Sequence, residues 1–229
     1  YNTLDYTNPK LGPAKENGGG VSRMNTRTFS WTWNNIATYD KTIGEHHFNV
    51  LAGMESYSYR YDELTASRSK MAQPDMPELV VGSQLTGGSG YRIDYALVGY
   101  LTQLLYDYRN KYFFSASYRR DGSSRFAPET RWGNFWSVAG AWNIMREGFM
   151  SKYSFLSNLR IRASYGINGT LPSDNYGYMS LMSYTSKYMG NPGGTITTVT
   201  NDKLSWETSY NTNVGCLLYT SPSPRDRSL

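Results

Sequence analysis

The sequence has very little cysteine, little histidine and no long hydrophobic run. Its one cysteine among 229 residues, Cys216, excludes a disulfide framework and a cysteine-based metal site. No stretch of about 18 apolar residues occurs, and the mean hydropathy is -0.58, so we expect no membrane-spanning helix. The chain begins at Tyr1 without an initiator methionine or signal peptide, which predicts either processing or an internal piece of a longer protein.

Motifs for catalysis, metal binding and nucleic-acid binding are also missing. The two histidines, His46 and His47, are adjacent, and adjacent side chains of a strand point to opposite faces, which disfavours a shared metal ion. No G-x-S-x-G nucleophile elbow occurs. The net charge is +5, but the basic residues are scattered and no nucleic-acid-binding motif accompanies them. We therefore expect no enzymatic activity, no cofactor, no metal and no nucleic-acid partner.

Aromatic residues and strict alternation are what the sequence does contain. The chain has 21 Tyr, 6 Trp and 8 Phe. Between residues 158 and 168 every second side chain is apolar and the others are polar or glycine; the apolar ones are Leu159, Ile161, Ala163, Tyr165 and Ile167. This pattern predicts a strand with one apolar and one polar face. A soluble sandwich would cover the apolar face with a second sheet, whereas a membrane barrel would turn it to lipid.

Six further segments alternate in a similar way, with a few apolar exceptions on the polar side. With the first segment they predict about seven strands, at 25–39, 45–61, 91–108, 112–120, 132–144, 158–168 and 203–215. Tilted strands of about 9 to 11 residues cross a bilayer, and soluble strands usually have about 5 to 6. The length of the predicted strands therefore favours an antiparallel transmembrane β-barrel, present here in part.

The connections between these strands differ in length in a regular way. Residues 1–21 are expected to be a loop, and thereafter short connections (40–44, 109–111, 145–157) alternate with longer ones (62–90, 121–131, 169–202). Bacterial outer-membrane barrels have short periplasmic turns and longer extracellular loops. Within the loop 121–131, Asp121 to Ser124 have the composition of a tight turn. Residues 145–157 have room for one helical turn.

Tyrosine and tryptophan gather near the ends of the predicted strands. The residues near short turns are Tyr39, Tyr106, Tyr108, Tyr112 and Trp142, and those near a long connection are Tyr57, Tyr59 and Tyr61. Two such groups are expected for aromatic girdles at the two membrane interfaces. Ordinary cross-strand packing of aromatic rings is the alternative.

Several sequence motifs resemble those of one protein family in their order and spacing. They are SASYRRDGSSRF at 115–126, RWGNFWSVAGAW at 131–142, LSNLRIRASYG at 156–166 and LSWET at 204–208. This series is similar to the barrel of SusC/RagA-type TonB-dependent outer-membrane transporters of Bacteroidota, over about residues 22–215. The resemblance implies a barrel of about 22 strands closed by a plug domain, and import of oligosaccharides or peptides. It also implies energy from TonB and a SusD-type surface lipoprotein as a lid; the plug and the TonB-contacting segment are not in this sequence.

Polar side chains on the predicted lumen faces are the candidate functional residues: Gln103, Asp107, Arg119, Arg160, Arg162 and Glu207. Arg or Lys on the lipid face would cost about 2 to 4 kcal/mol at the bilayer midplane, so the membrane alone dictates where such residues lie. Two roles remain open for them. They form a polar conduit that pairs with plug and solute, or they form a network of ion pairs that holds the barrel wall.

The last residues depart from the pattern. Residues 216–229 contain two prolines and several serines, which end a strand, and they resemble translated sequencing-adapter DNA. We therefore predict two parts, a barrel fragment at 1–215 and a foreign tail at 216–229. The favoured function is nutrient import across the outer membrane; the alternatives are a soluble β-rich carbohydrate-binding surface protein and, more remotely, a membrane-barrel hydrolase.

Overall fold

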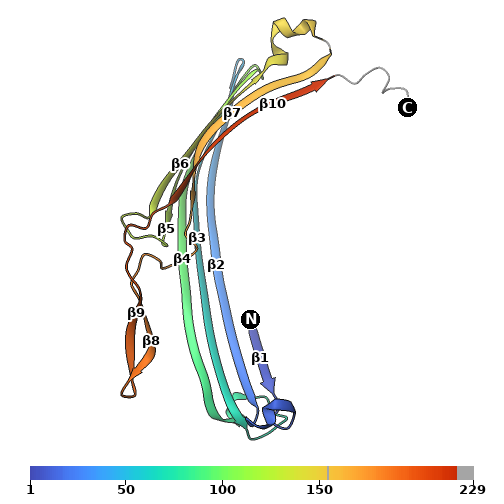
Figure 1. Cartoon of the computed structure of the whole chain (residues 1–229). Coiled ribbons are helices and arrows are strands. Elements are labelled where there is room, and N and C mark those ends of the chain that lie inside the picture. Colours follow the sequence, from blue (N-terminus) through green and yellow to red (C-terminus); the bar gives the residue numbers. More distant parts are fainter. Residues whose placement is uncertain (154, 221–229) are drawn as a thin grey trace, which may run out of the picture. The chain divides into compact units, whose positions relative to one another are not determined.

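The structure is a computed structural model that describes residues 1–153 and 155–220 (Figure 1). Its elements, in chain order, are β1 (Asn2–Thr7), η1 (Gly12–Lys15), β2 (Gly20–Ile43), β3 (His46–Met71), η2 (Leu79–Val81), β4 (Gly82–Tyr108), β5 (Tyr112–Ser123), β6 (Trp132–Asn143), η3 (Ile144–Arg146), η4 (Gly148–Lys152), β7 (Leu156–Thr170), β8 (Leu181–Tyr188), β9 (Asn191–Thr198) and β10 (Glu207–Thr220). Here η denotes a 3-10 helix. Within the described residues, no helix has the length and apolar character needed to cross a membrane.

Eight of the strands form one sheet in the order β1-β2-β3-β4-β5-β6-β7-β10, and β8 pairs with β9 in a separate hairpin. The strand pairs with a defined register are antiparallel. The expectation of an all-β antiparallel fold is therefore confirmed. The number of strands is larger than expected, because β1 and the β8–β9 hairpin lie in segments predicted to be loops.

The chain divides into two compact units. Unit 1 comprises Tyr1–Trp31 and Tyr57–Tyr95, and unit 2 comprises Thr32–Ser56 and the described residues from Ala96 onward. Strands β2, β3 and β4 contribute residues to both units, whereas β5, β6, β7 and β10 belong to unit 2.

The prediction of a long connection at residues 62–90 is wrong. Strands β3 and β4 run for 26 and 27 residues, and only residues 72–81 lie between them, with η2 inside. The reason is visible in unit 1, where both faces of this hairpin carry polar groups. Arg60 pairs with Asp94 at 2.7 Å on one face, and Tyr91 donates a hydrogen bond to Glu63 at 3.0 Å on the other. Backbone pairing continues there without the apolar alternation by which a strand is recognised in sequence.

Strand β10 also extends beyond its predicted end at Gly215. Its pairing with β7 continues from Cys216, opposite Ile161, to Thr220, opposite Leu156. The prolines that were expected to end the strand begin only at Pro222, and the intervening residues are compatible with a strand. Residues 221–229 lie outside the described part of the chain. The foreign origin of 216–229 stays a prediction.

The turn between β4 and β5 is as short as the sequence suggested. Arg109 and Asn110 both have positive φ, at 55° and 53°, and the Lys111 amide donates to the Tyr108 carbonyl at 2.9 Å. Positive φ at both central residues is the geometry of a type I′ turn, whose twist matches that of the strands. The helical turn expected in 145–157 is present as η3 and η4.

Candidate functional site

The strand register assigns the side chains of unit 2 to two faces. Residues directly opposite each other in an antiparallel pair point to the same side of the sheet. Following the pairs from β4 to β10 gives one apolar row after another on the first face, hereafter the apolar face. Its middle rows are Leu104–Ala116–Val138–Tyr165–Thr212 and Thr102–Tyr118–Trp136–Ile167–Tyr210.

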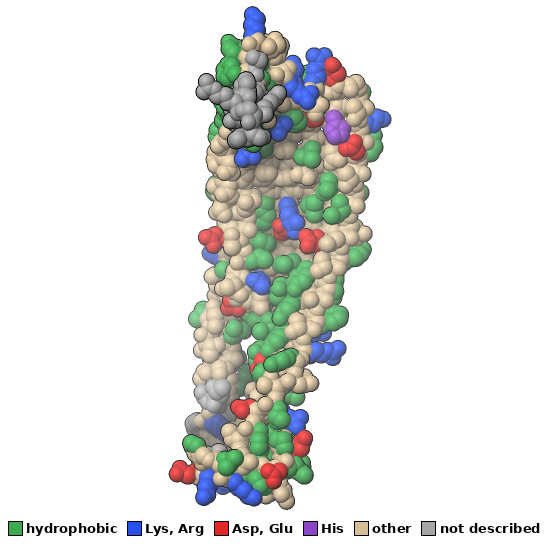
Figure 2. All heavy atoms as spheres, turned by 90° about the vertical axis from the view of Figure 1, so that its right-hand side faces the viewer, with side chains coloured by type: hydrophobic (Ala, Val, Ile, Leu, Met, Phe, Trp, Pro, Cys, Tyr) green, Lys and Arg blue, Asp and Glu red, His purple; other side chains and the backbone are tan. Residues whose placement is uncertain are grey.

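The opposite face, hereafter the polar face, carries small polar and charged side chains. Its rows are Gln103–Ser117–Ser137–Gly166–Asn211, Leu105–Ser115–Ala139–Ser164–Asn213 and Asp107–Phe113–Ala141–Arg162–Gly215. By the same register Arg119, Arg160 and Glu207 lie on this face. The structure thus brings all six candidate residues to one side of the sheet, and their orientation toward a lumen stays a prediction. Figure 2 shows basic and acidic side chains interspersed on the side of the chain that it views.

The apolar face is open in the described part of the chain. Val138, Ile161 and Tyr165 are 38%, 42% and 40% exposed, although they lie in the middle of their strands. A second sheet covering the predicted apolar row at 158–168 would have made them inaccessible. A soluble sandwich would require such a second sheet, and none covers this face in the described part of the chain.

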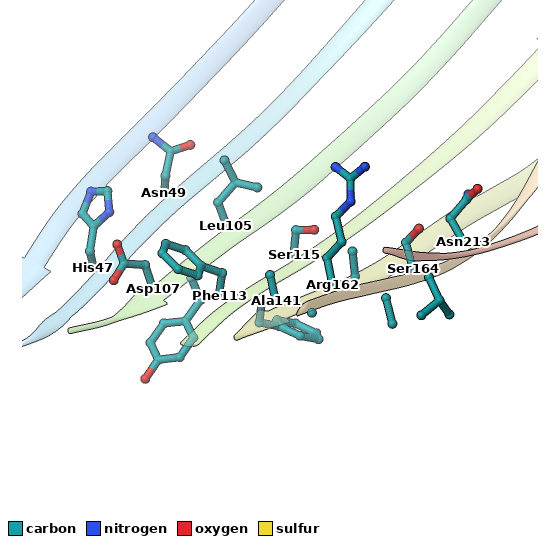
Figure 3. A pocket seen from close by; sticks show the side chains of 16 residues that line it. His47, Asn49, Leu105, Asp107, Phe113, Ser115, Ala141, Arg162, Ser164 and Asn213 are labelled. Atoms are coloured by element: carbon teal, nitrogen blue, oxygen red, sulfur yellow. The ribbon is translucent and has the colours of Figure 1, made fainter. Parts of the chain in front are cut away.

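A hollow of about 810 Å³ lies on the polar face (Figure 3). Its wall comes from β3, β4, β5, β6, β7 and β10, and its labelled polar side chains include His47, Asp107, Arg162 and Asn213. Phe113 contributes an apolar surface beside them. A second, smaller hollow of about 440 Å³ lies nearer the other end of the same face and includes Gln103 and Arg119.

Arg119 is held by acidic side chains. Its Nε donates to both carboxylate oxygens of Asp121 at 2.7 and 2.8 Å, and its Nη2 donates to Glu55 at 3.3 Å. The pair lies directly against Gly99, where a Cβ atom would come within 2.5 Å of Asp121 and 2.7 Å of Arg119. A glycine inside a strand often marks such a close approach, which is the sequence signal that was available for Gly99. This cluster fits a structural role in the wall.

Arg160 and Arg162 are different, because no acidic side chain pairs with either in the described residues. The Arg160 guanidinium lies 4.4 Å from the ring centre of Phe113. Arg162 is exposed in the large hollow, and a Cβ at Gly215, its cross-strand neighbour, would lie 2.9 Å from its Nε. These two cations are therefore available to a negatively charged group that lies over the polar face.

The other three candidates have no common site. Asp107 accepts a hydrogen bond from the Asn110 amide at 2.7 Å, so it shapes the β4–β5 turn. Gln103 lines the small hollow. Glu207 is exposed at the first position of β10. The sequence identified the correct face for these residues but did not distinguish their roles.

Aromatic side chains form a ladder across four strands at the short-turn end of the apolar face. The ring centres of His46 and Tyr108 are 4.8 Å apart, and Tyr112 is 6.3 Å from both Tyr108 and Trp142 with nearly parallel planes. His46 also hydrogen-bonds Tyr106 through Nδ1 at 2.8 Å. Of the aromatics expected near the short turns, Tyr106, Tyr108, Tyr112 and Trp142 take part in these ring contacts.

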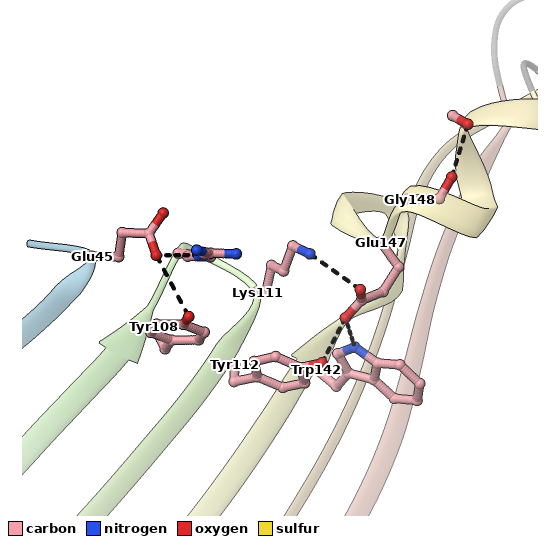
Figure 4. Close-up of polar contacts among 9 residues, drawn as sticks. Glu45, Tyr108, Lys111, Tyr112, Trp142, Glu147 and Gly148 are labelled. Atoms are coloured by element: carbon pink, nitrogen blue, oxygen red, sulfur yellow. Dashed lines mark hydrogen bonds and ion pairs between the residues drawn. The ribbon is translucent and has the colours of Figure 1, made fainter.

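Acidic side chains in the adjoining turns accept hydrogen bonds from the O–H and N–H groups of this ladder (Figure 4). Glu147, between η3 and η4, accepts hydrogen bonds from Tyr112 at 2.7 Å and Trp142 at 3.1 Å and pairs with Lys111 at 3.1 Å. These donors lower the pKa of the Glu147 carboxyl, with the Tyr112 hydroxyl as the largest cause. At the neighbouring turn Glu45 pairs with Arg109 and raises the pKa of that guanidinium. Sequence reasoning missed Glu147, which lies in a segment without periodicity.

Two histidines that are adjacent in sequence point to opposite faces, as expected. His47 lies on the polar face, where its Nε2 is 3.1 Å from Asp40, while His46 joins the aromatic ladder. In the described residues no group of three or more His, Cys, Asp or Glu side chains has the geometry to hold a metal ion.

A small buried core at the long-loop end of unit 2 was not anticipated. Phe126 is fully buried, and the ring of Trp206 lies 5.1 Å from Phe126 and 5.2 Å from Phe135. The Trp206 indole also donates to the Arg131 carbonyl at 3.0 Å. The loop between β5 and β6 is thereby joined to the segment before β10. Three of the sequence motifs that carried the family resemblance contribute residues to this core.

Comparison with known proteins agrees with this geometry. The TonB-dependent receptor SusC of Bacteroides thetaiotaomicron is 28% identical over 194 residues, covering 82% of this chain and 19% of its own length. A TonB-dependent receptor of Formosa agariphila is 30% identical over 219 residues, covering 93% and 21%. The structure of the RagAB peptide transporter superposes with a TM-score of 0.83 at 27% identity, over 88% of this chain and 23% of the other. The chain belongs with the SusC/RagA-type TonB-dependent transporters.

The match covers only part of these relatives. The chain spans about a fifth of the length of the curated relatives. No protein-family model matches the sequence. A RagAB peptide importer in an open state gives a similar superposition, with a TM-score of 0.80. The antiparallel sheet is therefore part of a barrel of the SusC/RagA type, which confirms the predicted fold class.

Proposed function

We propose that the chain forms part of the barrel wall of an outer-membrane, TonB-dependent importer of nutrients such as oligosaccharides or peptides. Relatives named as TonB-dependent receptors and as a peptide transporter support this assignment. The single observation that carries it is the open apolar face of unit 2, which lies back to back with a polar face on the same strands. Such a sheet needs lipid on one side and water or polar protein on the other.

The dimension of the apolar face supports a membrane position. On β4 the apolar-face residues run from Tyr108, in the aromatic ladder, to Val98. Ten residues at about 3.3 Å each, tilted by about 40°, rise about 25 Å, which is the height of the apolar band of an outer-membrane barrel. In unit 1 the ion pair Arg92–Asp62, at 2.6 Å, and the hydrogen bond from Tyr61 to Glu63 lie on opposite faces of the same hairpin. Unit 1 therefore suits an aqueous position outside the hydrocarbon.

Under this proposal the short turns lie in the periplasm and the other connections outside the cell of a Bacteroidota-type bacterium. The polar face lines the lumen, and Arg160 and Arg162 are available to acidic groups of the plug or of a solute. The wall itself performs no catalysis. A SusD-type surface lipoprotein and TonB act through parts of the parent protein beyond this segment. Residues 1–215 form the barrel piece, and 216–229 are a tail of foreign origin.

Cysteine labelling in the full-length parent, in its native outer membrane, tests the proposal. Ile161→Cys on the apolar face is compared with Ser164→Cys on the polar face of the same strand, in a background from which any other accessible cysteine has been removed. We expect Ile161→Cys to react with a lipid-soluble maleimide and to resist a charged one. Reaction of Ile161→Cys with the charged reagent as fast as an exposed loop cysteine would refute the lipid-facing orientation.

A further inference from the structure

Arg120 is an exception on the apolar face of unit 2. On this face the described residues of β5, β6, β7 and β10 include one charged side chain, and it is Arg120. It lies near the long-loop end of β5, opposite Tyr100 on β4 and Asn134 on β6. No acidic side chain pairs with it in the described part of the chain, whereas Arg119, one residue away on the polar face, has two carboxylate partners.

The surroundings of Arg120 form a flat aromatic shelf. Its guanidinium carbon lies 5.2 Å from the centre of the Trp132 ring, and Trp132 stacks on Tyr100 with ring centres 6.2 Å apart. The Trp132 ring lies against Gly122, where a Cβ atom would come within 2.9 Å of it. A larger residue at that position would lift the ring from the sheet. The shelf thus holds the cation against aromatic rings, and in barrels such rings commonly lie at the level of the lipid headgroups.

A second donor lies directly across the strand pair from Arg120. The Tyr118 hydroxyl donates to Asn134 Oδ1 at 2.8 Å, which orients the amide and leaves its Nδ2 group without a partner among the described side chains. Side chains opposite each other in an antiparallel pair have Cβ atoms about 5 Å apart. Arg120 and Asn134 can therefore donate to the same anion. A phosphate fits this pair better than a carboxylate, because two of its oxygens can accept from the guanidinium and a third from the amide.

We propose that Arg120, with Asn134 and the Trp132 shelf, binds the phosphate of an outer-leaflet lipid of the lipid A type. Charge complementarity favours this occupant. An unpaired cation at the rim of the apolar band is unfavourable beside hydrocarbon, and it is favourable where an anionic headgroup lies at the same height. The inference rests on the proposed function, because the long-loop end of β5 must face the outer leaflet.

Lipid binding to the full-length parent tests this site. Delipidated parent protein in detergent is incubated with phosphorylated or dephosphorylated lipid A, and bound lipid is counted by native mass spectrometry. The variants are Arg120→Gln and, as a matched control, Arg160→Gln, which removes the same charge from the polar face. Loss of one interfacial arginine contact should weaken binding of phosphorylated lipid A about fivefold. Arg160→Gln and the dephosphorylated lipid should show no such difference.

Two results would overturn the inference. Equal binding of phosphorylated lipid A by Arg120→Gln and the unmodified parent would do so, and so would an equal loss in Arg160→Gln. An Arg120→Lys variant, which keeps the charge without the planar fork, should bind at an intermediate level. Failure of the proposed function itself is seen separately, because the unmodified parent would then be found outside the outer-membrane fraction.

Discussion

Placing an arginine on either side of one strand provides a sharp test of the two faces. Val138 and Ala139 are neighbours in the middle of β6 and point to opposite sides of the sheet. Val138 lies four residues from Trp142 in the aromatic ladder and four residues from Asn134 at the other rim. It is therefore at the centre of the apolar band. Ala139 lines the large hollow on the polar face.

Val138→Arg should destabilise the full-length barrel by about 2 to 4 kcal/mol, the cost of a cation at the bilayer midplane. This corresponds to about a 30- to 700-fold change in the folding equilibrium. Ala139→Arg keeps its charge on the side that is wet or in contact with polar protein, and it removes no hydrogen bond of the Ala139 side chain. We expect its cost to stay below about 1 kcal/mol, as is usual for a surface substitution that disturbs no special feature, allowing for the larger side chain.

Reversible unfolding by guanidinium in phospholipid vesicles measures both variants against the unmodified parent. The free energies of unfolding of the three proteins are compared from fits that share one slope (m) against denaturant concentration. Equal destabilisation by the two substitutions would refute the assignment of faces. A larger cost for Ala139→Arg than for Val138→Arg would reverse it. Either outcome would also remove the basis for placing Arg120 at a lipid interface.

Three further predictions concern single contacts. Gly99→Ala should displace the Arg119–Asp121 pair and lower stability by about 1 to 3 kcal/mol, the usual cost of overpacking, whereas Gly140→Ala, whose Cβ would meet nothing closer than 3.8 Å, should be neutral in the same unfolding assay. Because hydrogen bonds lower the pKa of Glu147, its contribution is complete above the ordinary glutamate value of about 4.3 and is lost as the pH falls through the lowered value. The hydrogen-exchange protection of residues 144–153, taken relative to the intrinsic exchange rate at each pH, should therefore fall in acid, and Glu147→Gln should remove this pH dependence; an unchanged profile would exclude the carboxylate as its cause. Trp206→Ala should cost up to about 3 to 5 kcal/mol and expose the β5–β6 loop to proteases, and an unchanged cleavage rate would show that this core does not hold the loop.

The sequence by itself determined the class of the fold and the two faces of the central strands. Side chains alternate with a period of two along a strand, so the apolar residues at 159, 161, 163, 165 and 167 must lie on the same face. The same rule placed the six candidate polar residues together on the other side. The positions of the short turns and of the aromatics beside them also follow from local composition.

Only the tertiary structure decided which segments without an alternating pattern form strands, and which polar groups contact one another. The extensions of β3 and β4 in unit 1 carry charges on both faces, so hydropathy does not mark them as strands, and only backbone pairing with neighbours does. Likewise the partners of Arg119 come from positions 55 and 121, and the core around Phe126 includes Trp206. Such contacts join residues far apart in sequence through strand register, and register depends on the whole sheet rather than on any one segment.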